Sequence, residues 1–505
     1  MKKNLIAMSV VTALATTSFA SDMNKEMYNQ IQALKAQIEA LEKKVAQQEA
    51  KDKEAQKAVT NVAPTQQKVA VDEKRIENIE KKLETVSKTA TTAKIQSAQD
   101  NIKWDVDFRT QVDNIQYKHA DGSKSKNDAL LTNRLWLGAK YKADDNSSFF
   151  GKLSYNKAFG ERIKGNNTNY DEFNWVTNEN ANDDDIKLKE AYWLYQNERL
   201  FGTDIPWSVS VGRRPSTDGL PINIRNDQQP NSPLSHTIDV EFDGFSFKID
   251  TEGVTGFTGS WLKLCGGRGL TNATPRFDNN GTPYSTDNQE IDDIDMLGLI
   301  YVPYDDGQYS VHMQYSHAWN LIGFNTQPTF EDVGDIDLAT VLFKTEGIGD
   351  GISDYLDNTT AFASFAMSKT NPNSKGMLGT TDSQTGYSVW LGVNAPCPIL
   401  PDSAKIGFEW NKGSKYWRSM TYGEDTYAGS KIAARGQAFE VYRTQKLTEA
   451  LSFGVSYVYI DYDYTGSNSF FGADGEPMSM SDAQANGQNP VKEAQDIRAY
   501  MRYKF

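Results

Sequence analysis

Beyond residue 101, hydrophobic and polar residues alternate along much of the chain. In the first such segment, Ile102, Trp104 and Val106 are separated by charged residues. The same alternation recurs at 131–141, 149–155, 207–211, 309–317, 387–393, 451–459 and 497–505. A period of two is typical of a β-strand that has one face in an apolar environment and the other in water. The pattern predicts an all-β fold for residues 101–505.

The connections between these segments are short and long in turn. Short polar connections lie around residues 144–146, 252–253, 305–307, 395–401 and 446–448. Long polar stretches lie at 118–129, 158–186, 215–236, 266–293, 320–334, 369–384, 411–431 and 465–491. A soluble sandwich also alternates within its strands, but a regular exchange of short turns and long loops is what membrane barrels show. We therefore expect an antiparallel transmembrane β-barrel of about 16 strands, with both ends on the short-turn side. The weakest alternation is at 187–195, 336–342 and 359–367.

The last segment, 495–505, keeps its alternation to the final residue and ends the chain on Phe505. In this it resembles outer-membrane barrel proteins, whose final strand with a terminal Phe is recognised by the barrel assembly machinery. The resemblance implies the same partner for this chain. Aromatic residues also occur at strand ends beside the short turns, as at Trp104 and Phe149. In membrane barrels such residues form the interfacial girdles.

The N-terminus follows a different pattern. Residues 1–20 combine Lys2 and Lys3 with an apolar run and a small-residue cleavage site after Ala20. These are the features of a secretory signal peptide, so we expect the mature chain to leave the cytoplasm.

Residues 21–100 carry apolar residues at spacings of three and four, in one phase before Pro64 and in a new phase after it. These residues form a narrow apolar stripe, which a single helix cannot bury. The stripe therefore favours self-association with a second copy of the helix. We expect an α-helical coiled-coil segment that forms a stalk in the periplasm. The alternative is a solvated linker helix.

Composition limits the possible classes further. Residues 101–505 contain 37 Lys and Arg against 54 Asp and Glu, so the barrel region is acidic and we expect no nucleic-acid partner. No run of about 18 apolar residues follows the signal peptide, which excludes helical membrane proteins. The two cysteines, Cys265 and Cys397, do not make a disulfide scaffold. Cys265 would lie at the outer end of its strand and Cys397 in a short turn at the opposite end of the barrel wall, so we expect both to stay unbridged.

Stalk and barrel together resemble porins that carry an N-terminal periplasmic coiled coil, such as the sucrose-type and phosphate-selective groups. They also resemble an uncharacterised family of outer-membrane proteins with this layout. The local motifs are VSVGRRPSTDG at 209–219 and KLKEAYWLY at 187–195. In such porins a strand with a similar ending leads into the loop that narrows the pore, so the resemblance implies that residues 215–236 fold inward. A loop that stays outside is the alternative. The constriction loop would carry Arg214, Asp218, Arg225 and Asp227.

If the apolar strand faces meet lipid, the residues between them point into the lumen. The cations expected there are Arg109, Arg134, Lys140, Lys152, Lys187, Lys189, Arg498 and Arg502. Barrel closure would place them on one wall, with Asp218 and Asp227 facing them. The electric field between these opposite charges would cross the lumen and select ions by the sign of their charge. In the alternative, these side chains are hydrated and compensate one another, together with Asp105, Asp107 and Asp113 of the same wall.

The sequence offers no convincing catalytic site. Of the four histidines, His119 and His236 fall in loops, whereas His312 and His317 have opposite strand parity and cannot share a metal ion. We find no paired nucleophile and base and no haem attachment motif. We therefore expect no enzyme, no catalytic or metal-binding residues and no cofactor.

The leading hypothesis is an outer-membrane porin, a passive diffusion channel for small hydrophilic solutes or ions, assembled as a homotrimer. Its barrel would contact outer-membrane lipid and lipopolysaccharide, and its stalk could meet peptidoglycan or another periplasmic partner. One alternative is a structural protein with a plugged barrel that tethers the envelope. Another is a barrel that sheathes an electron-transfer partner. An outer-membrane enzyme would need the catalytic pair that is missing.

Overall fold

The computed structural model describes residues 102–159, 186–271, 292–324, 330–349, 351–467, 469 and 475–505. The predicted signal peptide at 1–20 and the predicted stalk at 21–100 lie outside the described residues. No helix in the described part of the chain is both long and apolar enough to cross a membrane.

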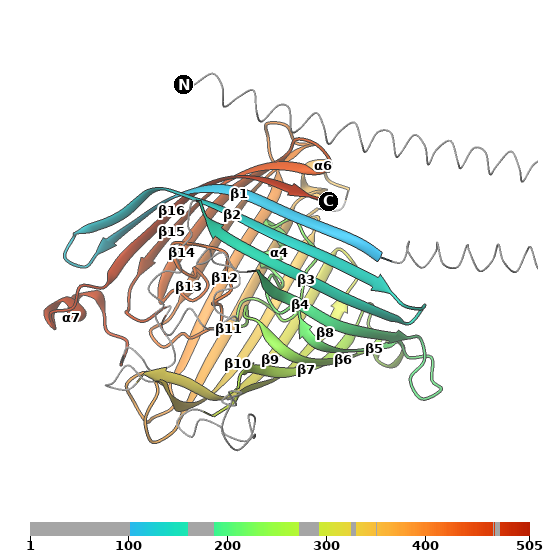
Figure 1. Ribbon diagram of the computed structural model, residues 1–505, viewed down its shortest axis with the longest axis horizontal. Coiled ribbons are helices and arrows are strands. Elements are labelled where there is room, and N and C mark those ends of the chain that lie inside the picture. The colour runs from blue at the N-terminus through green and yellow to red at the C-terminus, as the bar shows by residue number, and fades with distance from the viewer. Residues whose placement is uncertain are drawn as a thin grey trace, which may run out of the picture. The chain divides into compact units, whose positions relative to one another are not determined.

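The described residues form sixteen strands in one closed sheet (Figure 1). The strands are β1 Ile102–His119, β2 Lys124–Lys142, β3 Ser147–Ala158, β4 Lys187–Asn197, β5 Trp207–Arg214, β6 Phe242–Asp250, β7 Trp261–Leu270, β8 Ile294–Asp305, β9 Tyr309–Phe324, β10 Phe330–Glu346, β11 Thr360–Pro372, β12 Thr385–Pro396, β13 Ala404–Gly413, β14 Gly436–Lys446, β15 Leu451–Tyr462 and β16 Val491–Lys504. Four short helices accompany them in this part of the chain: α4 Ile222–Arg225, α5 Glu252–Thr255, α6 Asp354–Asp357 and α7 Met480–Ala485.

Each strand pairs antiparallel with its neighbours in sequence, and β16 returns to pair with β1. The seam is completed at the end of the chain, where Phe505 and Val106 exchange two backbone hydrogen bonds of 2.9 Å. The prediction of an antiparallel barrel with about 16 strands is therefore confirmed. The three segments with the weakest alternation are the strands β4, β10 and β11.

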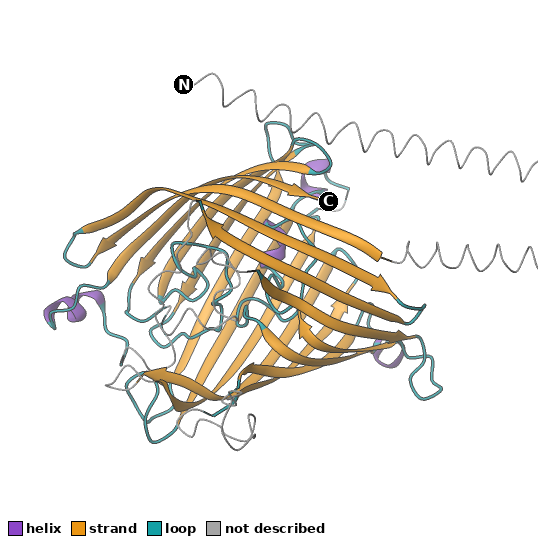
Figure 2. Cartoon of the chain, in the orientation of Figure 1, coloured by secondary structure: helices purple, strands orange, loops and turns teal. Residues whose placement is uncertain are grey.

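Short turns and long connections alternate as expected, but several of the long stretches are partly strand, three of them markedly so. β1 and β2 meet at a tight turn after His119, β7 runs on to Leu270, and β9 and β10 extend to Phe324 and from Phe330. Figure 2 shows strands that extend beyond the ends of their neighbours in the sheet. The sequence-based boundaries were wrong there because the alternation is lost in two ways. The start of β2, at 124–128, is polar on both faces, whereas Leu321 and Ile322 of β9 are adjacent and both buried.

The outer face of the barrel is apolar along its middle, and aromatic residues concentrate at the short-turn end. Phe365, near the middle of β11, is 49 % exposed and pairs in register with Val341 and Val389. Trp104 and Phe149 lie exposed beside the short-turn end. This surface would be costly in water and is suited to contact with hydrocarbon, with the aromatic rings at its boundary.

The two cysteines lie far apart in the fold and both are free. Cys265 sits in the middle of β7 rather than at its outer end, and Cys397 sits in the short turn between β12 and β13.

A lysine at the middle of the outer face tests whether this face meets lipid. We expect Phe365→Lys to lower the free energy of unfolding from lipid vesicles by about 2–4 kcal/mol, because a cation at the bilayer midplane loses its hydration. The control Phe365→Leu, which stays apolar, should cost less than about 1.5 kcal/mol. Urea unfolding followed by tryptophan fluorescence measures both variants. Equal losses for Lys and Leu would show that the face is not in hydrocarbon.

Candidate functional site

Two connections fold into the barrel. We call residues 215–241, between β5 and β6, the first lumenal loop, and residues 414–435, between β13 and β14, the second lumenal loop. Most of their side chains are buried, and both can be followed as coils inside the cylinder in Figure 2. The loop expected to narrow a pore thus lies inside the barrel, and it is accompanied there by a second one.

Apolar side chains hold the first lumenal loop against the inner wall. Leu220 and Leu234 pack with the inward-facing Leu342 of β10, whereas Ile222 of α4 packs with Phe362 and Trp390 of β11 and β12. The inner wall of β10–β12 therefore carries large apolar side chains among its hydroxyl-bearing ones, which is unusual for a water-filled barrel. The loop follows this wall because its hydrophobic residues are buried there.

His236 fixes the same loop by polar contacts. Its Nδ1 and Nε2 lie 2.7 Å from Ser364 Oγ and 2.9 Å from Ser388 Oγ, and its ring lies edge-on to Trp390 and Trp417. Burial lowers the pKa of His236 to about 3, so the ring stays neutral near neutral pH. This histidine has a structural position between the loop and the wall.

The two lumenal loops are bonded directly to each other. Ile238 and Met420 form a parallel bridge, with Met420 N–H donating to Thr237 O at 2.8 Å and Asp239 N–H donating to Met420 O at 2.7 Å. Gly423 N–H donates to Asp239 O at 2.7 Å. The loops therefore occupy the lumen as one packed unit.

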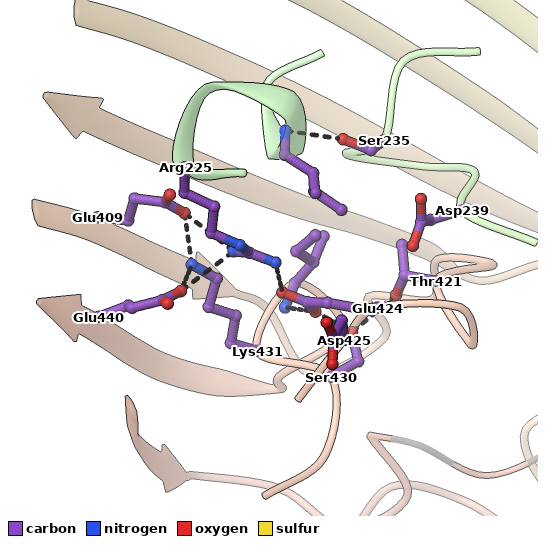
Figure 3. A network of polar contacts seen from close by, with 12 residues as sticks. Arg225, Ser235, Asp239, Glu409, Thr421, Glu424, Asp425, Ser430, Lys431 and Glu440 are labelled. Atoms are coloured by element: carbon purple, nitrogen blue, oxygen red, sulfur yellow. Dashed lines mark hydrogen bonds and ion pairs between the residues drawn. The ribbon is translucent and has the colours of Figure 1, made fainter. Parts of the chain in front are cut away.

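A buried ion network joins this unit to β13 and β14 (Figure 3). Arg225, at the end of α4, lies 3.1 Å from Glu440 and 3.1 Å from Glu424, and 3.4 Å from Glu409. Lys431 of the second lumenal loop forms ion pairs with both Glu409 and Glu440. Two cations thus share three carboxylates. Because all five groups are nearly inaccessible to water, removal of one would leave an unpaired buried charge.

A second network joins the unit to the wall formed by β1, β2 and β16. Asp425 pairs with Arg109 at 2.6 Å, with Arg134 at 3.1 Å and with Arg498 at 3.1 Å. Burial acts to raise the pKa of Asp425, but the charges of Arg109, Arg498 and Arg134 hold that pKa well below its usual range. Arg498 also binds Asp113 at 2.6 Å.

Other predicted lumenal cations are paired as well. Arg502 Nε donates to Asp107 at 2.8 Å, and Lys189 lies 3.0 Å from Glu241 of the first lumenal loop. Lys152 forms an ion pair with Glu190. The structure brings the predicted cations of β1, β2 and β16 together on one wall, as closure requires, and places their compensating acids beside them.

The remaining predicted site residues are spread over the lumen. Lys140 lies exposed near the short-turn end with its Nζ 4.9 Å from the ring centroid of Phe150, and Lys187 begins β4. Asp218 accepts a hydrogen bond of 2.8 Å from Asn226 Nδ2 within its own loop. Asp227 lies at the exposed tip and pairs with Lys446 at 3.4 Å. Asp218 acts electrostatically on Arg502, and Asp425 of the other loop supplies the ion pairs with the arginines, which the sequence did not predict.

Cavities lie on both sides of the Asp425 network along β16. On the loop side, a cavity of about 600 Å³ is lined by Val491 and by Tyr117 and Tyr427. On the short-turn side, a cavity of about 280 Å³ is lined by Arg502 and Lys504. Arg498 lies between these levels on the same strand. The ion network therefore separates two hollow regions of the lumen.

The profile of the family described as "Protein of unknown function (DUF3373)" matches residues 124–505. The chain belongs to this family. No curated protein gives a significant match.

Solved structures similar to this DUF3373 member include porins. OprB of Pseudomonas putida shares 11 % identity over 82 % of this chain and 96 % of its own, with a TM-score of 0.47. The anion-selective porin of Comamonas acidovorans shares 11 % identity over 80 % and 99 %, with a TM-score of 0.46. OmpF of Salmonella typhi, solved in complex with daunomycin, shares 11 % identity over 81 % and 99 %, with a TM-score of 0.43. The predicted resemblance to an uncharacterised family is confirmed by the match over residues 124–505.

Sequence reasoning missed the acids that organise the lumen of this DUF3373 barrel. Asp425 and Glu424 lie in a stretch that was interpreted only as a long polar loop. Glu409 and Glu440 carried a usable signal, because each has inward parity on its strand and they lie directly opposite each other in register. Two like charges in such positions call for a shared cation, which Lys431 and Arg225 provide.

The Asp425 network predicts how firmly the second lumenal loop is held in this DUF3373 protein. We expect Asp425→Asn to weaken the attachment by about 3–5 kcal/mol, because three buried arginines lose their shared carboxylate. Trypsin should then cleave at Lys415, Arg418 or Lys431 at least about tenfold faster, since 1.4 kcal/mol corresponds to a factor of about ten. The control Asp402→Asn, in an exposed short turn, should leave cleavage unchanged. Unchanged cleavage in Asp425→Asn would contradict the assignment.

Proposed function

We propose that this protein is an outer-membrane porin, a passive diffusion channel for small hydrophilic solutes or ions. The observation that carries the proposal is the closed barrel with an apolar outer face and a lumen lined by charged and hydroxylated side chains. Such a cylinder provides a polar path through a layer that polar solutes cannot otherwise cross. Loops folded inside the barrel narrow that path.

The geometry supports a path along β1 and β16. The two cavities on this side lie at different levels of the wall, and the side chains between them are charged and hydrogen bonded rather than packed with hydrophobic residues. On the opposite side, the apolar contacts with β10–β12 fill the lumen. Separation of Asp425 from the arginine wall would join the two cavities.

Location and partners belong to the same proposal. The signal peptide at 1–20 would direct the chain out of the cytoplasm, and the C-terminal Phe505 would be recognised by the barrel assembly machinery. The barrel would contact lipid and lipopolysaccharide and form a homotrimer. Residues 21–100 would extend into the periplasm, where peptidoglycan or a periplasmic protein could bind them.

Planar-bilayer recording tests the channel. We expect purified protein without its signal peptide to give discrete conductance steps in potassium chloride, because each inserted barrel adds one aqueous path. Asp425→Asn should raise the conductance of each step, since it loosens the group that separates the two cavities. A heat-modifiable band on a gel serves as the control for folding. Folded protein that gives no steps in either form would contradict the proposal.

A plugged barrel that tethers the envelope is the second candidate, and one observation favours it. The two lumenal loops fill much of the lumen with buried networks that resemble a protein core. This candidate predicts no conductance and a detached outer membrane in cells that carry a deletion of residues 21–100. The channel predicts conductance and no such dependence on the stalk.

A further inference from the structure

We propose that the cavity on the loop side of the Asp425 network is a binding site for small neutral solutes that carry several hydroxyl groups, such as sugars. We call it the loop-side cavity. The inference rests on the proposed function, because it names the class of solute that the channel would admit from this side.

The loop-side cavity is formed by four parts of the described chain. It lies between β1, β2, the second lumenal loop and the connection from β15 to β16. Its volume of about 600 Å³ falls within the roughly 300–1,000 Å³ range of sites for small organic molecules. Beside it, Ala428, Tyr462 and Met480 pack in one apolar cluster with Tyr117 and Val491. The cavity is therefore shaped by segments that pack against one another.

Among the described residues, no acidic or basic side chain lines the loop-side cavity. Arg435 lies behind the lining, where its Nε donates to Trp417 O at 2.9 Å and its Nη1 donates to Thr465 O at 2.8 Å. A charged solute in the cavity would lose its water and meet no countercharge in the lining. The cavity therefore favours a neutral solute, in contrast to the arginine wall beneath it.

Tyrosine rings supply apolar contacts in the cavity. Tyr117, Tyr427 and Tyr464 line it and are half-buried, and the buried Tyr462 lines it as well. The hydroxyl of Tyr117 donates a hydrogen bond of 2.8 Å to Tyr427 O, which holds the Tyr117 ring against the second lumenal loop. The face of an aromatic ring attracts C–H groups, and a sugar ring has C–H groups on its faces and hydroxyls around its edge. The tyrosines thus fit the faces of such a solute.

Hydroxyl groups of the lining supply polar contacts. Met478 N–H donates to Thr465 Oγ1 at 3.1 Å, and Arg435 N–H donates to Ser467 Oγ at 2.9 Å. A hydroxyl that accepts such a bond keeps its own O–H group, which can still be donated. Thr426 also lines the cavity, and its Oγ1 is buried without a hydrogen-bond partner among the described residues. An apolar ligand would leave these groups unsatisfied, so the solute should itself carry hydroxyls.

The loop-side cavity adjoins the group that separates the two hollow regions of the lumen. Residues 426–429 line it, and Asp425 directly precedes them. The ring centroid of Tyr427 lies 5.0 Å from Cζ of Arg498, which pairs with Asp425 at 3.1 Å. A solute in the cavity therefore contacts the segment that positions Asp425 before it reaches the charged wall.

A matched set of probes tests the class of solute. Glucose and glucuronate share one ring and differ by a carboxylate, whereas cyclohexanol has a six-membered ring with a single hydroxyl. In isothermal titration of the detergent-solubilised protein without its signal peptide, we expect glucose to bind at least about tenfold more tightly than either of the others. Glucuronate meets no countercharge, and cyclohexanol leaves hydroxyl groups of the lining unsatisfied. Equal affinity for glucose and glucuronate would overturn the proposal.

The variant T465V/S467A places the site. It removes two hydroxyl donors from the lining, so glucose affinity should fall at least about fivefold. The control T203V/T258V removes two exposed hydroxyls at short turns on the opposite side of the barrel and should leave glucose affinity unchanged.

A second variant covers the case in which T465V/S467A does not fold. We expect Y464A to weaken glucose binding about two- to tenfold, because the ring is lost, whereas Y464F keeps the ring and should weaken it less. A heat-modifiable band on a gel reports folding. Unchanged glucose affinity in each of these variants that folds would overturn the site.

Conduction separates this proposal from the channel itself. Glucose added on the loop side of a planar bilayer should lower the mean current through each barrel, and it should do so less in T465V/S467A. Conductance steps in a barrel that does not bind glucose would overturn the site and leave the channel intact. Glucose binding that depends on Thr465 and Ser467, in a barrel without conductance, would support the site and reject the channel.

Discussion

Closure of the sheet between β16 and β1 is the constraint on which the rest of the molecule depends. A strand edge left open in hydrocarbon would expose unpaired amides and carbonyls, so a sheet in a membrane has to return to its first strand. The hydrogen bonds between Phe505 and Val106 complete that return at the last residue of the chain. Closure also brings Arg498 and Arg502 next to Asp107 and Asp113, so the same seam that excludes lipid assembles the charged wall.

The interior is held by two kinds of contact on opposite sides. Towards β10–β12, the first lumenal loop is attached by apolar side chains such as Ile222 and by the neutral His236. Towards β1, β2 and β16, the second loop is attached by the carboxylate of Asp425 and by the hydroxyl of Tyr117, which donates a hydrogen bond of 2.8 Å to Tyr427 O. Apolar packing depends little on ionic conditions, whereas a charge network depends on each of its members. The charged wall is therefore the one along which we propose the path of the solute.

Much of the fold could be predicted from the sequence, because lipid and water impose alternate residues on every strand. The prediction of strand boundaries failed where this alternation ends, at the polar start of β2 and at the adjacent buried residues Leu321 and Ile322 of β9. Less of the candidate site could be predicted from the sequence. The cations of the wall could be found by parity, but a loop has no parity, so nothing in residues 414–435 indicated that Asp425 would point at Arg109 and Arg134.

The bridge between Ile238 and Met420 has a consequence for kinetics. Because these backbone bonds tie the loops together, neither segment can leave its place without taking the other along. The apolar anchor on one side and the carboxylate anchor on the other must then yield in the same event. Conduction through such a barrel would switch between discrete levels rather than vary smoothly. The rate of switching would be the rate at which a small folding unit detaches from the wall and binds to it again.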